Sequence, residues 1–269
     1  MGIINGTSNF MLTKMKEDHL SYEEALEMAQ NLGFAESDPT ADVKGIDAAR
    51  KIIILTQLAF GKKTVLEEMD ITGITHIQSL DFSIAEQLDG TIKLVALSEI
   101  KNGKIWTEVA PMFVSLEHPL AFVKNENNAV YVKGEAVGET MFYGPGAGRF
   151  PTANSVVSDI ISLAKDKNRK IQSENPVFQS QTTKLENNGV FSNIVIRFKG
   201  KEEADKETHY LLDRFQLMGW DATSLSTEND STKNVYITVK DFPREKWIDL
   251  ENTFSLDPHY RLEAIFSII

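Results

Sequence analysis

The chain has 269 residues, of which 42% are hydrophobic and 25% are charged, so it has the composition of a globular protein with one large or two ordinary domains. Its formal net charge of −11 argues against nucleic acid as a partner, because phosphates attract basic surfaces. The absence of cysteine excludes disulfides, thiolate nucleophiles and cysteine-bound metals. Neither a signal peptide nor a membrane-spanning apolar run is apparent, so we expect a cytoplasmic protein.

Two helices are predicted before the first glycine-terminated turn. The first runs from near Asn5 to Met15, and either Asn5 or Thr7 can cap it. The second opens on "SYEE", a capping box in which Ser21 and Glu24 satisfy each other's backbone amides. Gly33 suits the left-handed turn that ends this helix.

A third helix is predicted from about Val43 to Phe60, where Gly61 ends it. Its second half, "KIIILTQLAF", is apolar on nearly every side, and we expect it to be buried. Asp47 and Lys51 are four residues apart, so they lie on the same face of this helix. A lysine at the start of a buried segment must reach a pocket, a partner or a wet cleft.

Strands are predicted from Ile71 to Tyr143. "TIKLVALSEI" and "KIWTEVAPMFV" flank Asn102–Gly103, a strong hairpin signal. "AVYVKGEAVGETMFYG" predicts a second pair of strands that turns near Gly134. The glycine-rich "GPGAG" then leads into a helix with Pro151 in its first turn.

The polar segment at residues 169–189 has no clear period and is interpreted as a linker. The order predicted after it is strand, helix, strand, strand, helix, strand, which is a ferredoxin-like βαββαβ layout. We therefore predict an α+β protein. Residues 1–168 are expected to form a mixed β-sheet with helices on one face, and residues 190–269 a small βαββαβ domain.

An acidic loop leads into the third helix and contains Glu36, Asp38, Asp42 and Asp47. A solvated surface patch is the plainest interpretation. A divalent metal is less favoured, because the acids lack the alternating spacing of a calcium loop and no histidine is near. A pocket for an amino acid is the third alternative. Glu36 and Asp42 could bind its ammonium group, while Lys51 with Asp47 serves a polar carbonyl.

Other catalytic patterns are weaker. The five histidines have no metal-ligand spacing, and no G-x-S-x-G occurs. The stretch "GPGAG" at Gly144–Gly148 lacks the order of a dinucleotide fingerprint. It is either a tight strand-to-helix turn or a turn that lets a cofactor approach the backbone closely.

Three segments resemble homoserine dehydrogenases. The family signature is present as "AQNLGFAESDPTADVKGIDAARK" from Ala29 to Lys51. "GIINGTSNF" at Gly2–Phe10 and "YGPGAGRFPTANSVVSDI" at Tyr143–Ile160 are similar to two further family segments, in the same order. The resemblance covers about residues 2–165. It implies the NAD(P)-dependent interconversion of L-aspartate 4-semialdehyde and L-homoserine, a step of threonine and methionine biosynthesis.

The resemblance also implies roles for four charged residues. Lys51 matches the family's catalytic lysine, which donates the proton as hydride reaches the aldehyde carbon. Asp47 matches the carboxylate that positions the reacting oxygen or its water. Glu36 matches the residue that binds the substrate ammonium group, and Asp42 adds to its negative field.

Backbone and small residues complete the implied site. Gly6 and Thr7 fall where the family places backbone at the substrate and the nicotinamide. Gly146, Ala147 and Gly148 match the turn that touches the cofactor. The resemblance implies no metal held by this chain.

The family's Rossmann domain is not present in the chain. NAD(P)H binding in the full-length enzyme, the second catalytic lysine and a monovalent-cation site are therefore expected upstream of Met1. We expect a truncated chain that is inactive alone and assembles as a homodimer or higher oligomer. The βαββαβ part resembles an ACT domain, which senses amino acids or only assembles subunits. The alternative function is a non-enzymatic amino-acid-binding or dimerising protein; a carboxylate-based hydrolase is weaker.

Overall fold

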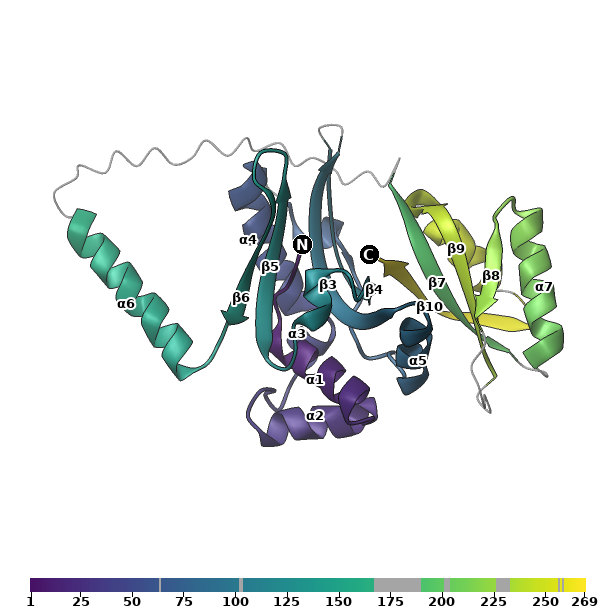
Figure 1. The fold of residues 1–269 in the computed structure, drawn as a ribbon, viewed down its shortest axis with the longest axis horizontal. Helices are drawn as coiled ribbons and strands as arrows, with labels where there is room; N and C mark the ends of the chain where they lie inside the picture. The colour runs from purple at the N-terminus through teal and green to yellow at the C-terminus, as the bar shows by residue number, and fades with distance from the viewer. Residues whose placement is uncertain are drawn as a thin grey trace. The chain divides into compact units, whose positions relative to one another are not determined.

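The computed structural model describes residues 1–62, 64–101, 104–166, 190–200, 204–225, 233–255, 257 and 259–269 (Figure 1). These residues form two compact units. The first unit comprises Met1–Thr75, Leu94–Ala110 and the described residues from Phe122 to Asp166. The second comprises His76–Lys93, Pro111–Ala121 and the described residues from Val190 to Ile269. The predicted boundaries at 168 and 190 stay a prediction, and the predicted linker lies outside the described residues.

The first unit is built on a mixed sheet, as predicted. Its strands adjoin in the order β6-β5-β1-β3-β4, and β2 runs parallel to β4. Its elements, with β3 and β4 shared between the units, are β1 (Gly2–Ile3), α1 (Gly6–Glu17), α2 (Tyr22–Asn31), α3 (Thr40–Val43), α4 (Ile46–Phe60), η1 (Leu66–Glu68), β2 (Asp70–Ile71), β3 (Gly90–Lys101), β4 (Lys104–Ser115), β5 (Asn127–Gly134), β6 (Gly138–Pro145) and α6 (Arg149–Asp166).

The first two helices start where the sequence predicts. Asn5, rather than Thr7, is the N-cap of α1 and accepts a hydrogen bond from the Ser8 amide. The capping box at the start of α2 is present in both directions. Gly33 follows α2 with φ +77°, the left-handed conformation that glycine adopts without strain.

The predicted third helix is α4, which begins at Ile46, and a separate short helix, α3, precedes it. Gly45, at φ +79°, breaks the chain between α3 and α4. A residue with a Cβ at this position would meet Val109 and Ile71 side chains at 3.1 and 3.4 Å. Gly61 ends α4 as predicted, with φ +65°. The predicted start near Val43 was early, because a glycine inside a helical pattern does not by itself predict a boundary.

The prediction that the second half of α4 is buried is wrong for this chain. Ile52 and Thr56 are buried, but Ile54 is 58% exposed and Leu58 is 73% exposed. Only one stripe of the helix is fully buried, and Ile53, Leu55 and Phe60 are partly buried beside it.

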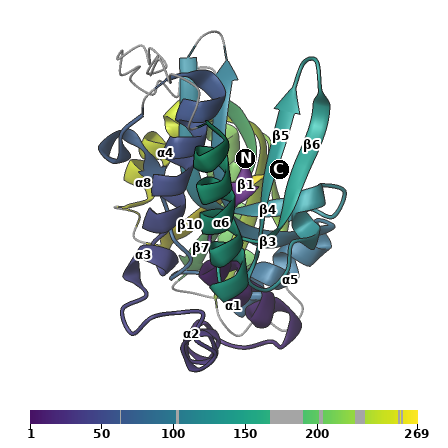
Figure 2. The same ribbon diagram turned by 90° about the vertical axis from the view of Figure 1, so that its left-hand side faces the viewer.

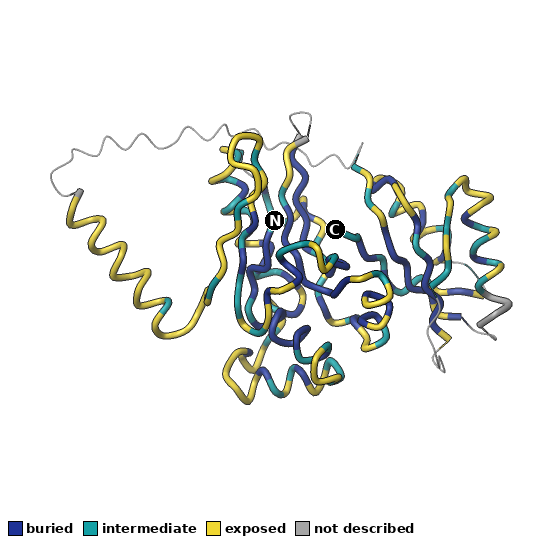
Figure 3. The backbone as a smooth tube through the Cα atoms, viewed as in Figure 1, coloured by how far each residue is buried: buried dark blue, intermediate teal, exposed yellow. Residues whose placement is uncertain are grey.

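The predicted strand pair is present as the hairpin of β5 and β6 (Figure 2). It turns near Gly134 as predicted, and Gly134 pairs with Gly138. Strand β6 ends the strand order of the first unit. Both β6 and α6 are largely exposed (Figure 3). Among the described helices, α6 included, none has the length and hydropathy needed to cross a bilayer.

The second unit has the predicted βαββαβ order in residues 190–269. Its strands adjoin in the order β10-β7-β9-β8, and the end of β10 runs parallel to the end of β4. Its elements are α5 (Ser79–Gln87), η2 (Pro119–Phe122, shared with the first unit), β7 (Phe191–Gly200), α7 (Ala204–Leu217), β8 (Ala222–Leu225), β9 (Asn234–Pro243), η3 (Arg244–Lys246), α8 (Trp247–Ser255) and β10 (Tyr260–Ile268).

Alternate residues of β7 and β9 form the core of this unit together with apolar side chains of α7 and α8. Phe198 contacts the rings of Phe215, Phe254 and Tyr260. The buried core residues are Ile194, Ile196, Phe198, Leu211, Phe215, Val235, Ile237, Val239, Phe242, Leu250, Phe254 and Tyr260.

Helix α5 lies in a segment predicted to hold only strands. Its fully buried Asp81 forms an ion pair with Arg197 of β7 and accepts a hydrogen bond from the Tyr236 hydroxyl of β9 at 2.8 Å. These partners are more than a hundred residues away in sequence. Local pattern therefore could not show why an acid occupies the core-facing side of this helix.

Candidate active site

Asn5 lies between β1 and α1 and is only 4% exposed. Its side-chain oxygen accepts the Ser8 amide at 2.8 Å and so caps α1. An asparagine at this position uses its oxygen for the helix and leaves two amide hydrogens for other acceptors.

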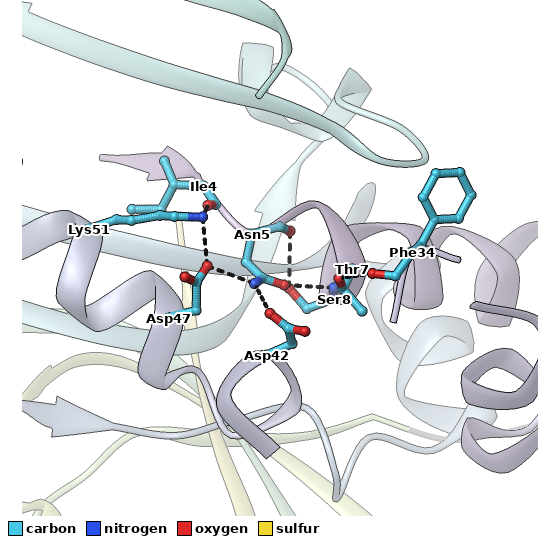
Figure 4. A network of polar contacts seen from close by, with 8 residues as sticks. All are labelled: Ile4, Asn5, Thr7, Ser8, Phe34, Asp42, Asp47 and Lys51. Carbon is cyan, nitrogen blue, oxygen red and sulfur yellow. Dashed lines mark hydrogen bonds and ion pairs between the residues drawn. The ribbon is translucent and has the colours of Figure 1, made fainter. Parts of the chain in front are cut away.

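Both of those hydrogens serve carboxylates. The Asn5 Nδ2 donates to Asp42 Oδ1 at 2.6 Å and to Asp47 Oδ2 at 2.9 Å (Figure 4). Asp42 belongs to α3 and Asp47 to the first turn of α4, on either side of the break at Gly45. One buried amide thus holds two acids that would otherwise repel each other.

Lys51 completes this contact network from the next turn of α4. Its Nζ lies 2.7 Å from Asp47 Oδ2 and donates to the backbone oxygen of Ile4 at 3.1 Å (Figure 4). The side chain is 48% exposed, so the ammonium group has fixed partners on one side and solvent on the other. The predicted pairing of Asp47 with Lys51 on one helix face is confirmed.

The loop that carries Glu36 is anchored by other residues. The Thr7 hydroxyl donates to the Phe34 oxygen at 2.6 Å (Figure 4), and the Gln30 amide donates to the Glu36 backbone oxygen at 3.1 Å. The Glu36 carboxylate is exposed and has no hydrogen bond or ion pair with any described residue. The structure therefore joins Asp42, Asp47 and Lys51, and leaves Glu36 at the surface of its loop.

Asp38 has a local structural role. Its Oδ1 accepts the Thr40 backbone amide at 3.1 Å, at the start of α3. The Thr40 side chain and amide together hold the pKa of Asp38 below its usual value. This acid shapes the turn that presents Asp42.

Gly6 is required by a close backbone approach. A Cβ at this position would lie 2.7 Å from the Glu126 backbone oxygen. The neighbouring Asn9 side chain, fully buried, donates to the Asn125 oxygen at 2.8 Å. The start of α1 is thereby fixed against the segment before β5, and no side chain at residue 6 intervenes.

The predicted cofactor turn is exposed. Gly146, Ala147 and Gly148 all lie at the surface between β6 and α6. Gly148 has φ +106°, which residues with a Cβ rarely adopt. A Cβ on Gly146 would lie 1.9 Å from the Asn128 amide nitrogen, so a larger residue at this position would have to displace the Asn128 side chain.

The arrangement can transfer a proton. An ammonium group has three hydrogens, and two of those on Lys51 are directed at Ile4 and Asp47. The third can reach a bound oxygen atom, where a positive donor stabilises developing negative charge. Within the described part of the chain, no group of three or more metal-binding side chains is present.

Sequence reasoning missed Asn5 as a member of this site. Its sequence pattern was that of a helix cap. An asparagine that caps a helix and one that also bridges two acids have the same local sequence pattern. The role of the Ile4 carbonyl could not be predicted either, because every residue has a backbone carbonyl.

The chain matches the family described as homoserine dehydrogenase over residues 1–161. A homoserine dehydrogenase of Bacillus subtilis is 53% identical over 166 residues, which are 62% of this chain and 38% of that protein. One from Lactococcus lactis is 46% identical over 61% of this chain and 39% of its own length. The chain thus spans well under half the length of these curated relatives.

Solved structures match along the whole chain. A homoserine dehydrogenase crystal structure from S. aureus at pH 7.5 aligns with a TM-score of 0.79 and 32% identity, over 100% of this chain and 64% of that one. Another, from Thiobacillus denitrificans, aligns with a TM-score of 0.81 and 27% identity, over 100% and 63%. These relatives all carry an enzyme's name, and they lend no support to the non-enzymatic alternative.

Proposed function

The chain belongs to the homoserine dehydrogenase family, and we propose that its first unit is the substrate-binding and proton-transferring part of such an enzyme. The reaction is the NAD(P)-dependent interconversion of L-aspartate 4-semialdehyde and L-homoserine. Because the chain spans 38% of the Bacillus subtilis relative, the proposal concerns the chemistry that these residues contribute.

The observation that carries the proposal is the placement of the Lys51 ammonium group. It is held between the Ile4 carbonyl and Asp47 at a half-exposed position, and its third hydrogen is available to a bound substrate. During aldehyde reduction Lys51 donates a proton to the forming alkoxide, and during alcohol oxidation the neutral amine accepts it back. Asp47 orients the lysine and the reacting oxygen.

The substrate's amino group requires a negative field. Glu36 is exposed, free of protein partners among the described residues, and close in sequence to Asp42. Its carboxylate can therefore take the ammonium group of the substrate without giving up another bond. Thr7 contributes by anchoring the Glu36 loop through Phe34.

NAD(P) supplies or accepts the hydride when it is bound. The turn at Gly146–Gly148 suits contact with it, because two glycines and an alanine leave the backbone exposed. There is open space beside Gly148: a Cβ added to this residue would lie 3.9 Å from its nearest neighbour, the Pro151 side chain. These residues hold part of the cofactor only, and the nucleotide-binding fingerprint is expected outside this chain.

Activity tests the proposal directly. A chimaera can join the part of the Bacillus subtilis relative that precedes the matched segment to residue 1 of this chain. We expect it to oxidise L-homoserine with NAD(P), and we expect Lys51→Met to abolish most of that rate. Lys246→Met, which removes an exposed ion pair with Asp249, is the control and should keep it. A chimaera that folds and binds NAD(P) but does not turn over L-homoserine would refute the proposal.

The isolated chain is expected to bind NAD(P) weakly and to turn over negligibly. Steady-state assays of the purified 269-residue protein check this expectation. Measurable homoserine oxidation by this protein alone would show that the nucleotide site does not need residues outside it.

The βαββαβ module at residues 190–269 is proposed to be ACT-like, and either to sense an amino acid or to assemble subunits. Its strand order β10-β7-β9-β8 supports the likeness. Calorimetry with L-threonine separates the two roles. A saturable heat favours sensing, and the absence of heat at millimolar concentrations favours assembly.

We also propose that the protein forms a homodimer through the edge of the first unit. Met141, Phe142 and Tyr143 lie on the edge strand β6 and are 38%, 68% and 56% exposed. An apolar edge strand exposes apolar side chains and unpaired backbone groups, and a second copy of the chain can cover both.

A further inference from the structure

Asn5 is the residue through which the lysine and the two acids are joined. Figure 4 shows its amide between Asp42 and Asp47, with Lys51 on the far side of Asp47. The backbone oxygen of the preceding residue, Ile4, receives the lysine ammonium group. The link between β1 and α1 therefore contacts every charged member of the network through one carbonyl and one side chain.

Capping alone does not account for this residue. Serine, aspartate and asparagine cap helices about equally well, because each offers an oxygen to the backbone amides. Of these, only asparagine also has an amide with two hydrogens to donate. Both of those hydrogens are used here, at 2.6 and 2.9 Å, on acids that belong to different helices.

The acids need such a donor. Asp42 and Asp47 both lie within hydrogen-bond distance of one nitrogen atom, so their negative charges are close together. Lys51 offsets one of them, because it contacts Asp47. Without the Asn5 amide, Asp42 would lose its partner in this network and Asp47 would be held by Lys51 alone.

We propose that Asn5 is a positioning residue, which fixes Asp42 and Asp47 and thereby holds the Lys51 ammonium group where the substrate oxygen binds. The inference rests on the proposed function for its consequence in substrate binding. Its structural part, the control of Lys51 through Asp47, stands on the geometry alone.

Two substitutions separate positioning from capping. Asn5→Ser keeps an oxygen for the Ser8 amide and removes the amide donor. Asn5→Asp keeps nearly the same shape as well, and places a third carboxylate between the two acids. Since both residues are good caps, both variants should fold with α1 intact.

The first measurement uses the full 269-residue chain with isotope-labelled lysine. NMR detects the Lys51 side chain through its ε carbon and ζ nitrogen. We expect its signal to move in both Asn5 variants, because Asp47 changes position or partner. Ser21→Ala, which removes the cap of α2 but touches no acid of the site, should lower the melting temperature and leave the Lys51 signal in place.

The second measurement is calorimetric titration of the same chains with L-homoserine. Asn5→Ser should bind about tenfold more weakly than the unmodified chain, because Asp42 and Asp47 both lose the donor that positions them. If the unmodified chain gives no heat, the proposed substrate pocket fails in this chain, and the Lys51 signal alone decides the role of Asn5. Failure of the two proposals is thus distinguishable.

Two outcomes would overturn the inference. An unmoved Lys51 signal in both variants would mean that Asn5 only caps α1. A shifted signal with unchanged homoserine affinity would mean that the acids move without consequence for the substrate.

Discussion

Lys51 makes contacts that contribute little to stability. An ion pair four residues apart on a helix, with side chains 48% and 29% exposed, is worth about 0.5 kcal/mol at most. The ammonium group is nevertheless held from two directions, by Asp47 and by the Ile4 carbonyl. Such restraint of a solvent-reaching group is what proton transfer to a bound oxygen requires.

Replacing Lys51 with alanine should therefore affect the rate more than the affinity. In the chimaera we expect the maximal rate to fall by about two to four orders of magnitude, with a smaller change in KM. Lys51→Arg should not restore the rate, because a guanidinium group is a poor proton donor at neutral pH. A steady-state assay checks both variants. An undiminished rate in Lys51→Ala would assign the proton to another group.

Glu36→Gln should act on binding instead. The substitution removes a charge from an exposed loop and leaves the Gln30 contact to its backbone oxygen intact. We expect KM for homoserine to rise about tenfold, as for a lost charge-assisted hydrogen bond, with little change in the maximal rate. Asp38→Asn is the matched control on the same loop, since Asp38 serves the Thr40 turn. Equal effects of both variants would point to loop charge rather than to Glu36.

At the scale of single residues the sequence predicted part of the site. Helical periodicity placed Asp47 beside Lys51, because four residues are about one turn. Asn5 was visible only as a cap. Its contacts with acids 37 and 42 residues away depend on how β1, α3 and α4 meet.

Helix α5 is attached to the sheet of the second unit by buried charge. Asp81 contacts Arg197 and Tyr236, and Gln78 at its N-cap accepts a hydrogen bond from Asn234 at 3.0 Å. Breaking such a pair by removing one partner leaves the other charge buried without compensation.

The Asp81 pair predicts a non-additive response. Asp81→Leu and Arg197→Met alone should each lower the free energy of unfolding by about 3–5 kcal/mol. The double variant should lose less than the sum, because no lone charge remains buried. Denaturant titration of the three proteins gives the coupling. Simple additivity would mean that the two side chains stabilise the unit independently.

His76 predicts a pH dependence within the same unit. Its ring stacks on Phe266, and burial, with Arg197 nearby, lowers its pKa from 6.5 to about 4. Between these pH values the unfolded chain binds a proton that the folded chain does not. The free energy of unfolding should therefore fall as the pH drops from about 6.5 to about 4, by up to roughly 3 kcal/mol, and this contribution should be constant outside that window.

Denaturant titrations at about pH 7 and about pH 4.5 check this slope. His76→Gln should remove the His76 contribution, while the carboxylates shared by both proteins continue to titrate. His209→Gln, on the exposed face of α7, is the control. Identical pH slopes for the unmodified chain and His76→Gln would contradict the expectation.

At the scale of the whole molecule, apolar side chains remain exposed in the first unit. Val132, Val137, Met141, Phe142 and Tyr143 of the β5–β6 hairpin are all at least 38% exposed. Side chains of α6 such as Ile160 and Leu163 are 58% and 68% exposed. An exposed apolar hairpin of this kind is typical of an interface.

Phe142→Lys should weaken self-association through β6. A charge on the edge strand opposes strand pairing with a second copy, and it removes the largest exposed apolar side chain of that strand. Sedimentation equilibrium should show a dimer for the unmodified chain and a shift toward monomer for the variant. Leu217→Lys, at a residue of α7 that is 85% exposed, is the control and should stay dimeric. A dimer that resists Phe142→Lys would place the interface elsewhere.

The sequence by itself determined the elements whose signals are local. The capping box at Ser21, the glycine stops at Gly33 and Gly61, and the βαββαβ order of residues 190–269 were all predicted. Each depends on residues within a few positions of one another, where caps, turns and periodicity act.

Only the tertiary structure decided what depends on distant partners. It separated α3 from α4 at Gly45, exposed the apolar end of α4, and buried Asp81 against Arg197. It also placed the Asn5 amide between two acids and the Lys51 ammonium group against the Ile4 carbonyl. These contacts join residues far apart in the chain, and their energies come from burial and from charges that local pattern does not bring together.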